Sequence, residues 1–233
     1  MNLTRITERV WVSDYEERRD RPALSYIRGD KYSVAVDAGH SADHLREFYE
    51  ALKEEDLPLP KLTVITHWHW DHSFAMHAVH GQTIANTRTA EYLRGFIAHR
   101  SPDYDRAFLA LDPSIAEEYK DGKEIVVVEP DIVFRDRFDI DAGGIHVLLR
   151  RCVSPHTDDS TLVYVPEERV LFFGDARSGV FPTWKADPEL LEQFILEMQK
   201  IDAVLFIGGH WDPYTKTDFL SELWIDLEME RMG

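Results

Sequence analysis

The chain has 233 residues and carries 26 Lys and Arg against 43 Asp and Glu, which gives a formal net charge of −17 at pH 7. An acidic surface of this kind repels a phosphate backbone, so we expect a small-molecule substrate and no nucleic-acid partner. The hydrophobic content of 44% fits a folded globular protein, and the length predicts one domain over residues 1–233.

The first 99 residues are predicted to alternate strands with helices. Short β-branched or aromatic runs indicate strands over 10–12, 23–28, 32–39 and 62–66. Apolar residues spaced at i, i+3, i+4 and i+7 predict a helix over 42–54, and similar patterns predict helices over 71–79 and 87–99. This alternation is typical of sheets that are covered by helices.

The polar segment 100–122 contains Pro102 and Pro113 and is predicted to be an inserted helical segment, either a lid or a connector. Beyond residue 124 the alternation resumes. Strands are expected over 125–128, 132–134, 145–152, 162–165, 170–175 and 203–210, and helices over 188–201 and 221–232. No linker rich in Gly or Pro divides the chain.

Four predicted strands lead into a side chain that can bind a metal. These side chains are Asp37, His67, Asp175 and His210. Functional residues of α/β folds collect at the carboxyl ends of strands, because the strands are rigid and the loops that follow are free to carry chemistry. The four residues are therefore candidates for one site.

The strongest motif is the run from Thr66 to His72, THWHWDH, which places three histidines and one aspartate within six residues. His67 and His69 are two positions apart, so in an extended segment they point the same way. Asp71 and His72 then begin the next predicted helix, where their directions diverge. Such a segment can serve two metal ions.

Further ligands must come from elsewhere in the chain, and the candidates are His156, Asp175 and His210. Three neutral imidazoles and one water make a tetrahedral zinc site with an open position. Burying three imidazoles and a carboxylate together without a cation would cost several kcal/mol, which favours metal binding over simple packing. Asp158 and Asp159, which follow His156, are expected to turn the chain.

The pattern His67-x-His69-x-Asp71-His72, followed by His156, Asp175 and His210, resembles the metallo-β-lactamase superfamily. The resemblance implies an α/β fold, an αββα sandwich of two mixed β-sheets with helices on the outer faces. It also implies two metal ions, with ligands as follows: His67, His69 and His156 for the first ion, Asp71, His72 and His210 for the second, and Asp175 as a bridge between them. Asp37 would orient a ligand histidine by a hydrogen bond.

Asp175 bears on the branch of the superfamily. Many genuine β-lactamases carry Cys or Ser at this position, and an aspartate is more similar to hydroxyacylglutathione hydrolases, lactonases and phosphodiesterase-type members. The flavodiiron branch has glutamate in place of the second histidine of the motif, where this chain has His69. The resemblance therefore favours the hydrolase branch with a bridging aspartate.

The expected function is a dinuclear hydrolase in which a metal-bound hydroxide attacks an ester, thioester or lactone of a small molecule. Asp71 is the candidate catalytic residue, which would orient the hydroxide and relay its proton. Zinc is the expected metal, with iron and manganese left open. Three alternatives remain: a phosphodiesterase for small phosphodiesters, a mononuclear iron enzyme that oxidises persulfides, and a non-catalytic sensor.

Four residues near or beyond the predicted bridging aspartate are candidates for substrate contact: Arg177, Phe181, Trp184 and Tyr214. Trp68 and Trp70 alternate with the ligands along the motif, so they are expected to face away from the metals and pack in the core. The sequence does not predict an oligomeric state.

Composition also bears on the location of the protein. Cys152 is the only cysteine, so no intramolecular disulfide can form. No run approaches the roughly 18 apolar residues of a membrane-spanning helix. The first 17 residues lack the apolar segment of a secretion signal. We therefore expect a cytoplasmic protein with no membrane partner.

Overall fold

The computed structural model describes residues 1–232 and contains two mixed β-sheets. The first sheet has its seven strands in chain order: β1 (Leu3–Arg5), β2 (Val10–Ser13), β3 (Ser25–Arg28), β4 (Ser33–Val36), β5 (Leu62–Val64), β6 (Gln82–Asn86) and β7 (Ile132–Phe134). Strands β1 to β4 pair antiparallel, whereas β4 to β7 pair parallel. The parallel part places the ends of β4 and β5 at one edge of the sheet.

The second sheet has six strands in the order β13, β12, β11, β10, β9, β8. Their bounds are β8 (Arg137–Asp141), β9 (His146–Arg151), β10 (Thr161–Val165), β11 (Val170–Gly174), β12 (Leu205–Gly208) and β13 (Tyr214–Thr215). Neighbouring strands pair antiparallel except for β11 and β12, which are parallel. The ends of β11 and β12 therefore also lie side by side.

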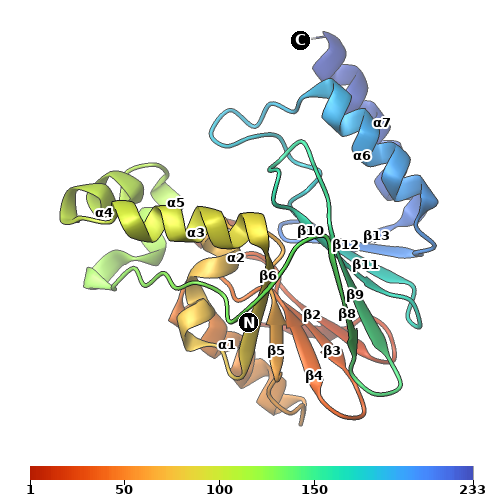
Figure 1. Cartoon of the computed structure of the whole chain (residues 1–233), viewed down its shortest axis with the longest axis horizontal. Helices are drawn as coiled ribbons and strands as arrows, with labels where there is room; N and C mark the ends of the chain where they lie inside the picture. The colour runs from red at the N-terminus through yellow and green to blue at the C-terminus, as the bar shows by residue number, and fades with distance from the viewer. Residues whose placement is uncertain (233) are drawn as a thin grey trace.

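Helices cover the outer faces of both sheets, as Figure 1 shows, with α1 to α5 on one side and α6 and α7 on the other. Their bounds are α1 (Ala42–Glu54), α2 (Trp70–Ser73), α3 (Thr87–His99), α4 (Pro102–Leu109), α5 (Pro113–Glu118), α6 (Pro188–Lys200) and α7 (Lys216–Met232). This is the predicted αββα sandwich. In the described residues, no helix is both long and apolar enough to span a membrane.

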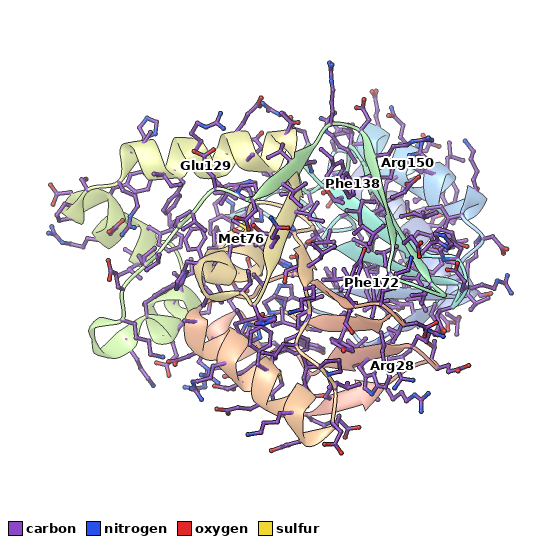
Figure 2. The ribbon with its side chains drawn as sticks, turned by 60° about the horizontal axis from the view of Figure 1, so that its bottom comes forward. Arg28, Met76, Glu129, Phe138, Arg150 and Phe172 are labelled. Atoms are coloured by element: carbon purple, nitrogen blue, oxygen red, sulfur yellow. The ribbon has the colours of Figure 1, made fainter. Side chains whose placement is uncertain are left out.

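Three buried apolar clusters hold the layers together. The cluster between the sheets is built from aliphatic side chains, Phe134 and Phe172, and Figure 2 labels Phe172 among the side chains of the central region. A second cluster lies beneath α1 and α3, and a third beneath α6 and α7. Each sheet is therefore buried on both faces over much of its area, which explains why runs such as Val170–Gly174 are continuously apolar.

Several element predictions are confirmed and a few are wrong. Helices over 42–54 and 87–99 are confirmed to the residue, and segment 100–122 is helical. The predicted helix over 71–79 is split into α2 and a 3-10 helix, Phe74–Ala78. The predicted strand over 125–128 is wrong, because Ile125 and Val127 are buried against the first helical layer without joining a sheet.

Strands β1, β6, β8 and the two-residue β13 were not predicted from the sequence. Strands β1 and β8 are sheet edges with mostly exposed or half-exposed residues, so they lack an apolar run. Strand β6 is central but carries Gln82, Thr83 and Asn86. Thr83 and Asn86 are satisfied by distant partners, Asp131 and Thr161, which a local pattern does not reveal.

Candidate metal centre

The candidate ligands lie where strands end at the common edge of the two sheets. His67 and His69 occupy the loop after β5, and Asp71 and His72 lie on the short helix α2 that follows. His156 lies in the loop between β9 and β10. Asp175 and His210 follow β11 and β12.

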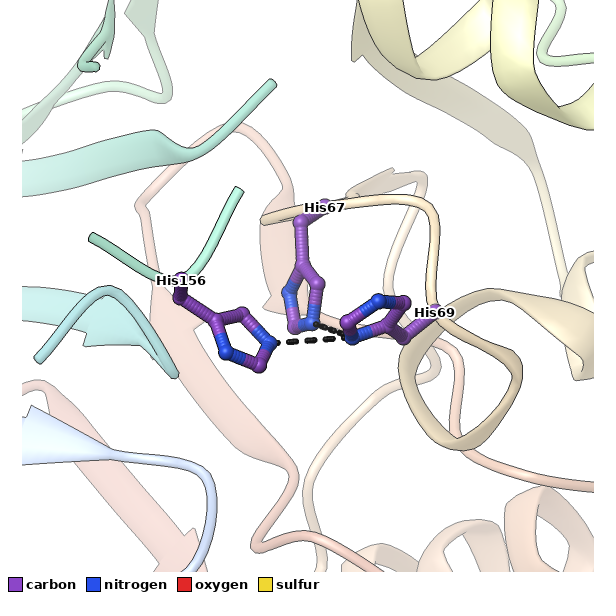
Figure 3. Close-up of side chains that lie close together, drawn as sticks. All are labelled: His67, His69 and His156. Carbon is purple, nitrogen blue, oxygen red and sulfur yellow. Dashed lines mark hydrogen bonds between the residues drawn. The ribbon is translucent and has the colours of Figure 1, made fainter. Parts of the chain in front are cut away.

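His67, His69 and His156 form the first group of possible metal ligands. Figure 3 shows the three rings pointing toward one another from two separate loops. His69 Nδ1 lies 3.1 Å from His67 Nε2 and 2.9 Å from His156 Nε2. Tetrahedral zinc with bonds of about 2.0–2.1 Å places its ligand nitrogens about 3.3 Å apart, so this spacing is close to that of a zinc site.

Asp71, His72, Asp175 and His210 form the second group. The Nε2 atoms of His72 and His210 each lie 3.0 Å from Asp71 Oδ2. The same two nitrogens lie 3.4 and 3.5 Å from the carboxylate oxygens of Asp175. The rings of His67 and His72 have centroids 4.2 Å apart, so the two groups adjoin. All seven predicted ligands are therefore brought together, and the bridging role of Asp175 stays a prediction.

Hydrogen bonds outside the two groups fix the orientation of the rings. Asp37 Oδ2 lies 2.8 Å from His72 Nδ1, while Asp37 Oδ1 accepts from the backbone N–H of Thr66 at 2.7 Å. His156 Nδ1 donates to the carbonyl of Gly179 at 2.8 Å. In both histidines Nδ1 is thereby occupied and Nε2 is left to face the site. Asp37 lies where the sequence placed it, beside a candidate ligand histidine.

The imidazoles of the first group are held neutral. Burial is the largest cause that lowers the pKa of His67 and His156, and it lowers the pKa of His69 to about 3. The proximity of the rings adds to this effect for His67 and His69, because each disfavours the charged form of its neighbours. Neutral imidazole is the form that binds metals.

In the second group, the attraction between histidines and carboxylates outweighs the effect of burial on each pKa. Burial would lower the pKa of His210, but Asp175 and Asp71 outweigh it and raise this pKa to about 9. The same two carboxylates and Asp37 outweigh burial at His72 and raise its pKa. Burial would raise the pKa of Asp71 and Asp175, but His72 and His210 outweigh it and lower both. Both carboxylates are therefore ionised.

Two buried polar atoms of the second group, His72 Nε2 and Asp175 Oδ1, have no hydrogen-bond partner. An unsatisfied buried polar group costs about 1–3 kcal/mol, so a ligand that binds both atoms would stabilise the site. Imidazole and carboxylate together are donors that zinc and other divalent ions accept. The residues of both groups therefore fit metal ions.

A cavity of about 520 Å³ opens beside the two groups. Its lining includes four of the candidate ligands, His69, Asp71, Asp175 and His210, and also Asp20, Trp70, Arg177, Trp184, Trp211 and residues of α7. This volume is that of a small-molecule site. Trp184, a predicted substrate contact, lies in the wall and stacks parallel to the His156 ring, with centroids 6.2 Å apart.

The other predicted substrate contacts are placed differently. Arg177 lines the cavity, but its guanidinium donates to Tyr214 Oη, Glu222 and Asp226. Phe181 and Tyr214 are not lining residues, because Phe181 packs edge-on against Trp70 and Tyr214 is engaged by Arg177. Trp70 is buried as predicted, yet one part of it also lines the cavity.

The family-model comparison matches residues 19–216 to the metallo-beta-lactamase superfamily. The chain belongs to the metallo-beta-lactamase superfamily. No curated protein sequence matches it.

Several solved structures are similar over nearly the whole chain. The metallo-beta-lactamase from Pontibacter korlensis is 20% identical with a TM-score of 0.70, over 97% of this chain and 98% of that chain. The DIM-1 metallo-beta-lactamase is 17% identical with a TM-score of 0.65, over 98% of each chain. The sec-alkylsulfatase Pisa1 from Pseudomonas sp. is 16% identical with a TM-score of 0.71, over 99% of this chain and 41% of that chain. Identities this low show the shared fold alone.

Sequence reasoning missed two residues that shape this superfamily site. Asp159 was expected only to turn the chain, but its buried carboxylate accepts hydrogen bonds from the backbone N–H of Trp68 and from the hydroxyls of Thr89 and Thr157. It thereby fixes the loop that carries His67 and His69. The partners are up to 91 positions away, so no local signal could reveal them.

Gly209 is the second residue that sequence reasoning missed, and the run Gly208-Gly209-His210 was the only sequence signal for its close approach to the ligands. A Cβ atom at position 209 would lie 2.6 Å from Asp175 Oδ1 and 2.7 Å from His72 Cε1. We expect Gly209→Ala to displace these ligands and to lower metal affinity about 10- to 100-fold, the range for residues that orient ligands. Competition with a chromogenic chelator measures this. Gly95→Ala is the control, because its Cβ has nothing within 4 Å, and equal affinity of both variants would contradict the prediction.

Metal affinity of the second group is expected to rise with pH. In the metal-free protein the proton on His210 stabilises the fold below the unfolded pKa of about 6.5, and this contribution is lost as pH rises through about 9. A metal ion must displace this proton, and also the proton on His72, whose pKa is raised by the same carboxylates, so affinity should rise at least about tenfold per pH unit between 6.5 and 8.5. Zinc titration in chelator-buffered solution measures the slope. An affinity independent of pH would contradict it, and the exposed His146 supplies a control variant, His146→Ala.

Proposed function

We propose that this protein is a metal-dependent hydrolase that cleaves an ester, thioester or lactone bond of a small molecule. The observation that carries the proposal is the pair of adjoining ligand groups, three neutral imidazoles beside two ionised carboxylates and two histidines, next to one cavity that four of these residues line. Two ions, with zinc expected, would be held by these groups, which is the arrangement of the hydroxyacylglutathione hydrolase and lactonase type that Asp175 favours.

Bound divalent ions would supply hydroxide at neutral pH and would polarise a carbonyl oxygen. The side chains of the chain contribute position and proton transfer. Asp71 Oδ2 faces both His72 and His210 at 3.0 Å, so its carboxylate is placed to orient a nucleophile and accept a proton. Trp184 and Trp211 in the cavity wall would hold the substrate and limit the access of water.

The test is a panel of model substrates with and without chelator, after separate loading with zinc, manganese and iron. The panel contains a nitrophenyl ester, a thioester, a lactone and bis-nitrophenyl phosphate. We expect turnover of at least one acyl compound, which chelator abolishes and metal restores. Higher turnover of the phosphodiester, or one bound iron with oxygen uptake and a persulfide substrate, would replace this proposal. The variant His67→Ala should be inactive, with His99→Ala as the control on the exposed end of α3.

A further inference from the structure

Asp20 is a carboxyl group in the lining of the metal cavity that belongs to neither group of candidate ligands. Its Oδ2 accepts from the indole N–H of Trp70 at 2.8 Å, and Trp70 directly precedes the candidate ligand Asp71 in the chain. Among residues 1–232, Asp20 Oδ1 has no hydrogen-bond partner, yet it is not one of the fully buried unpartnered atoms. This oxygen therefore keeps some exposed surface and can meet a molecule in the cavity.

The backbone of Asp20 lies in the left-handed region, with a φ of 49°. Few residues other than glycine adopt this conformation, although aspartate and asparagine tolerate it better than most. Asp20 ends the 3-10 helix Glu17–Arg19, and Glu16 and Arg21 close the turn around it through two backbone hydrogen bonds of 2.8 and 2.9 Å. Residues that the surrounding structure holds in such conformations concentrate at functional sites.

Two distant parts of the chain hold this turn. His40, which follows β4, is fully buried, and its Nδ1 donates to the carbonyl of Asp20 at 3.1 Å and to that of the preceding residue at 2.9 Å. Glu118, at the end of α5, accepts two hydrogen bonds of 2.8 Å from the guanidinium of Arg21. The fold as a whole, and not the local loop alone, therefore fixes the Asp20 carboxyl group in the cavity.

The surroundings of Asp20 favour its protonated form. Burial is the largest cause that raises the pKa of Asp20 to about 7, and the charges of Asp71 and Asp175 act in the same direction. His210 and the N–H of Trp70 oppose this rise. A carboxyl group that holds and releases a proton near neutral pH has the property that general acid catalysis requires.

We propose that Asp20 is a further catalytic residue, the general acid that gives its proton to the leaving group of the substrate. This inference rests on the proposed function, in which water loses one proton to Asp71 and its oxygen bonds to the acyl carbon. As the bond between the acyl carbon and the leaving oxygen or sulfur breaks, its electron pair goes to the leaving atom, which takes the proton of Asp20. Proton transfer from Asp71 to Asp20 through water in the cavity then restores both groups.

The test measures Asp20→Asn and the wild-type protein on two acetate esters of similar shape, para-nitrophenyl acetate and para-nitrobenzyl acetate. Nitrophenolate leaves as a stable anion, whereas the benzyl alkoxide is a strong base that needs a proton. We expect kcat/KM of the zinc-loaded variant to fall about 100-fold or more for the benzyl ester and to change little for the phenyl ester. Asp56→Asn is the matched control, because Asp56 is exposed and has a similar left-handed backbone, with a φ of 54°.

The asparagine variant removes little besides the proton donor, because asparagine tolerates the left-handed backbone and keeps an oxygen for the N–H of Trp70. An equal fall for both esters, or no fall for either, would overturn the inference and leave the hydrolase proposal standing. Failure of the wild-type protein to hydrolyse any acyl compound would overturn the hydrolase proposal and the inference with it.

Infrared spectroscopy tests the proton on Asp20 without turnover. At neutral pH the zinc-loaded wild-type protein should show the C=O stretch of a protonated carboxyl group, which Asp20→Asn loses and Asp56→Asn retains. The zinc-loaded protein is used because nearby divalent ions favour the charged form of a carboxyl group. Absence of a band that depends on Asp20 would overturn the inference and leave the hydrolase proposal standing.

Discussion

Asp175→Asn is expected to lower hydrolysis of the best acyl substrate by more than about 100-fold, the upper range for residues that only orient metal ligands. The carboxylate of Asp175 lies within 3.5 Å of the Nε2 atoms of both His72 and His210. The amide of Asn has the same shape as the carboxylate but carries no charge. The substitution therefore removes one of the two negative charges of the second group, those of Asp71 and Asp175, that would hold a divalent ion. Elemental analysis should show a stoichiometry that falls from two metals toward one.

The control for this variant is Asp139→Asn, which makes the same chemical change at an exposed position of β8. It should retain both metal content and activity. If Asp175→Asn kept two metals and full activity, neither ion would require Asp175 as a ligand. A loss of activity with unchanged metal content would assign Asp175 to substrate or proton handling.

The candidate ligands could be predicted because their signals are local. Four of them occupy one six-residue segment, and the others directly follow apolar strands or stand in a short loop. The two helices confirmed to the residue also begin with local signals, since Ser41 accepts from the N–H of His44 and Asn86 accepts from the N–H of Arg88.

The residues that were missed depend on partners far along the chain. Asp159 meets Trp68 across 91 positions, and a Cβ atom at Gly209 would meet His72 and Asp175, which other strands and loops of the chain supply. The same is true of the cavity residue Asp20, which meets Trp70 across 50 positions. A single aspartate in a loop gives the same sequence signal whether it turns the chain or fixes a ligand loop. The predicted contact role of Arg177 depended on a free guanidinium, and only the packing of α7 shows that Glu222 and Asp226 engage it.

Segment 100–122 could be predicted as helical but not as lid or connector, and one buried ion pair bears on that choice. Glu118 at the end of α5 is fully buried and accepts from Arg21 Nε and Nη2, both at 2.8 Å. Arg21 follows Asp20 directly and is 2% exposed. The hydroxyl of Ser41 also donates to Glu118. The insertion is thereby tied to the segment that carries Asp20.

Glu118→Gln is therefore expected to lower the free energy of unfolding by about 3 kcal/mol. Removing one partner of a buried ion pair leaves the other charge uncompensated, which typically costs about 3–5 kcal/mol. The lower end applies since Arg21 Nη1 keeps Glu47 at 3.1 Å. Urea unfolding of the metal-free protein measures the loss. Glu129→Gln is the matched control, because Glu129 pairs with Arg94 at 2.7 Å on the surface and should change stability by less than about 1 kcal/mol.

Equal stability of the two variants would show that the Arg21 and Glu118 pair does not hold the insertion, and a lid would then be the better description of segment 100–122. A double variant, Arg21→Met with Glu118→Leu, separates charge from packing. It removes both charges together, so it should recover much of the lost stability if the uncompensated guanidinium is the cause. A double variant as unstable as Glu118→Gln would instead assign the loss to packing around α5.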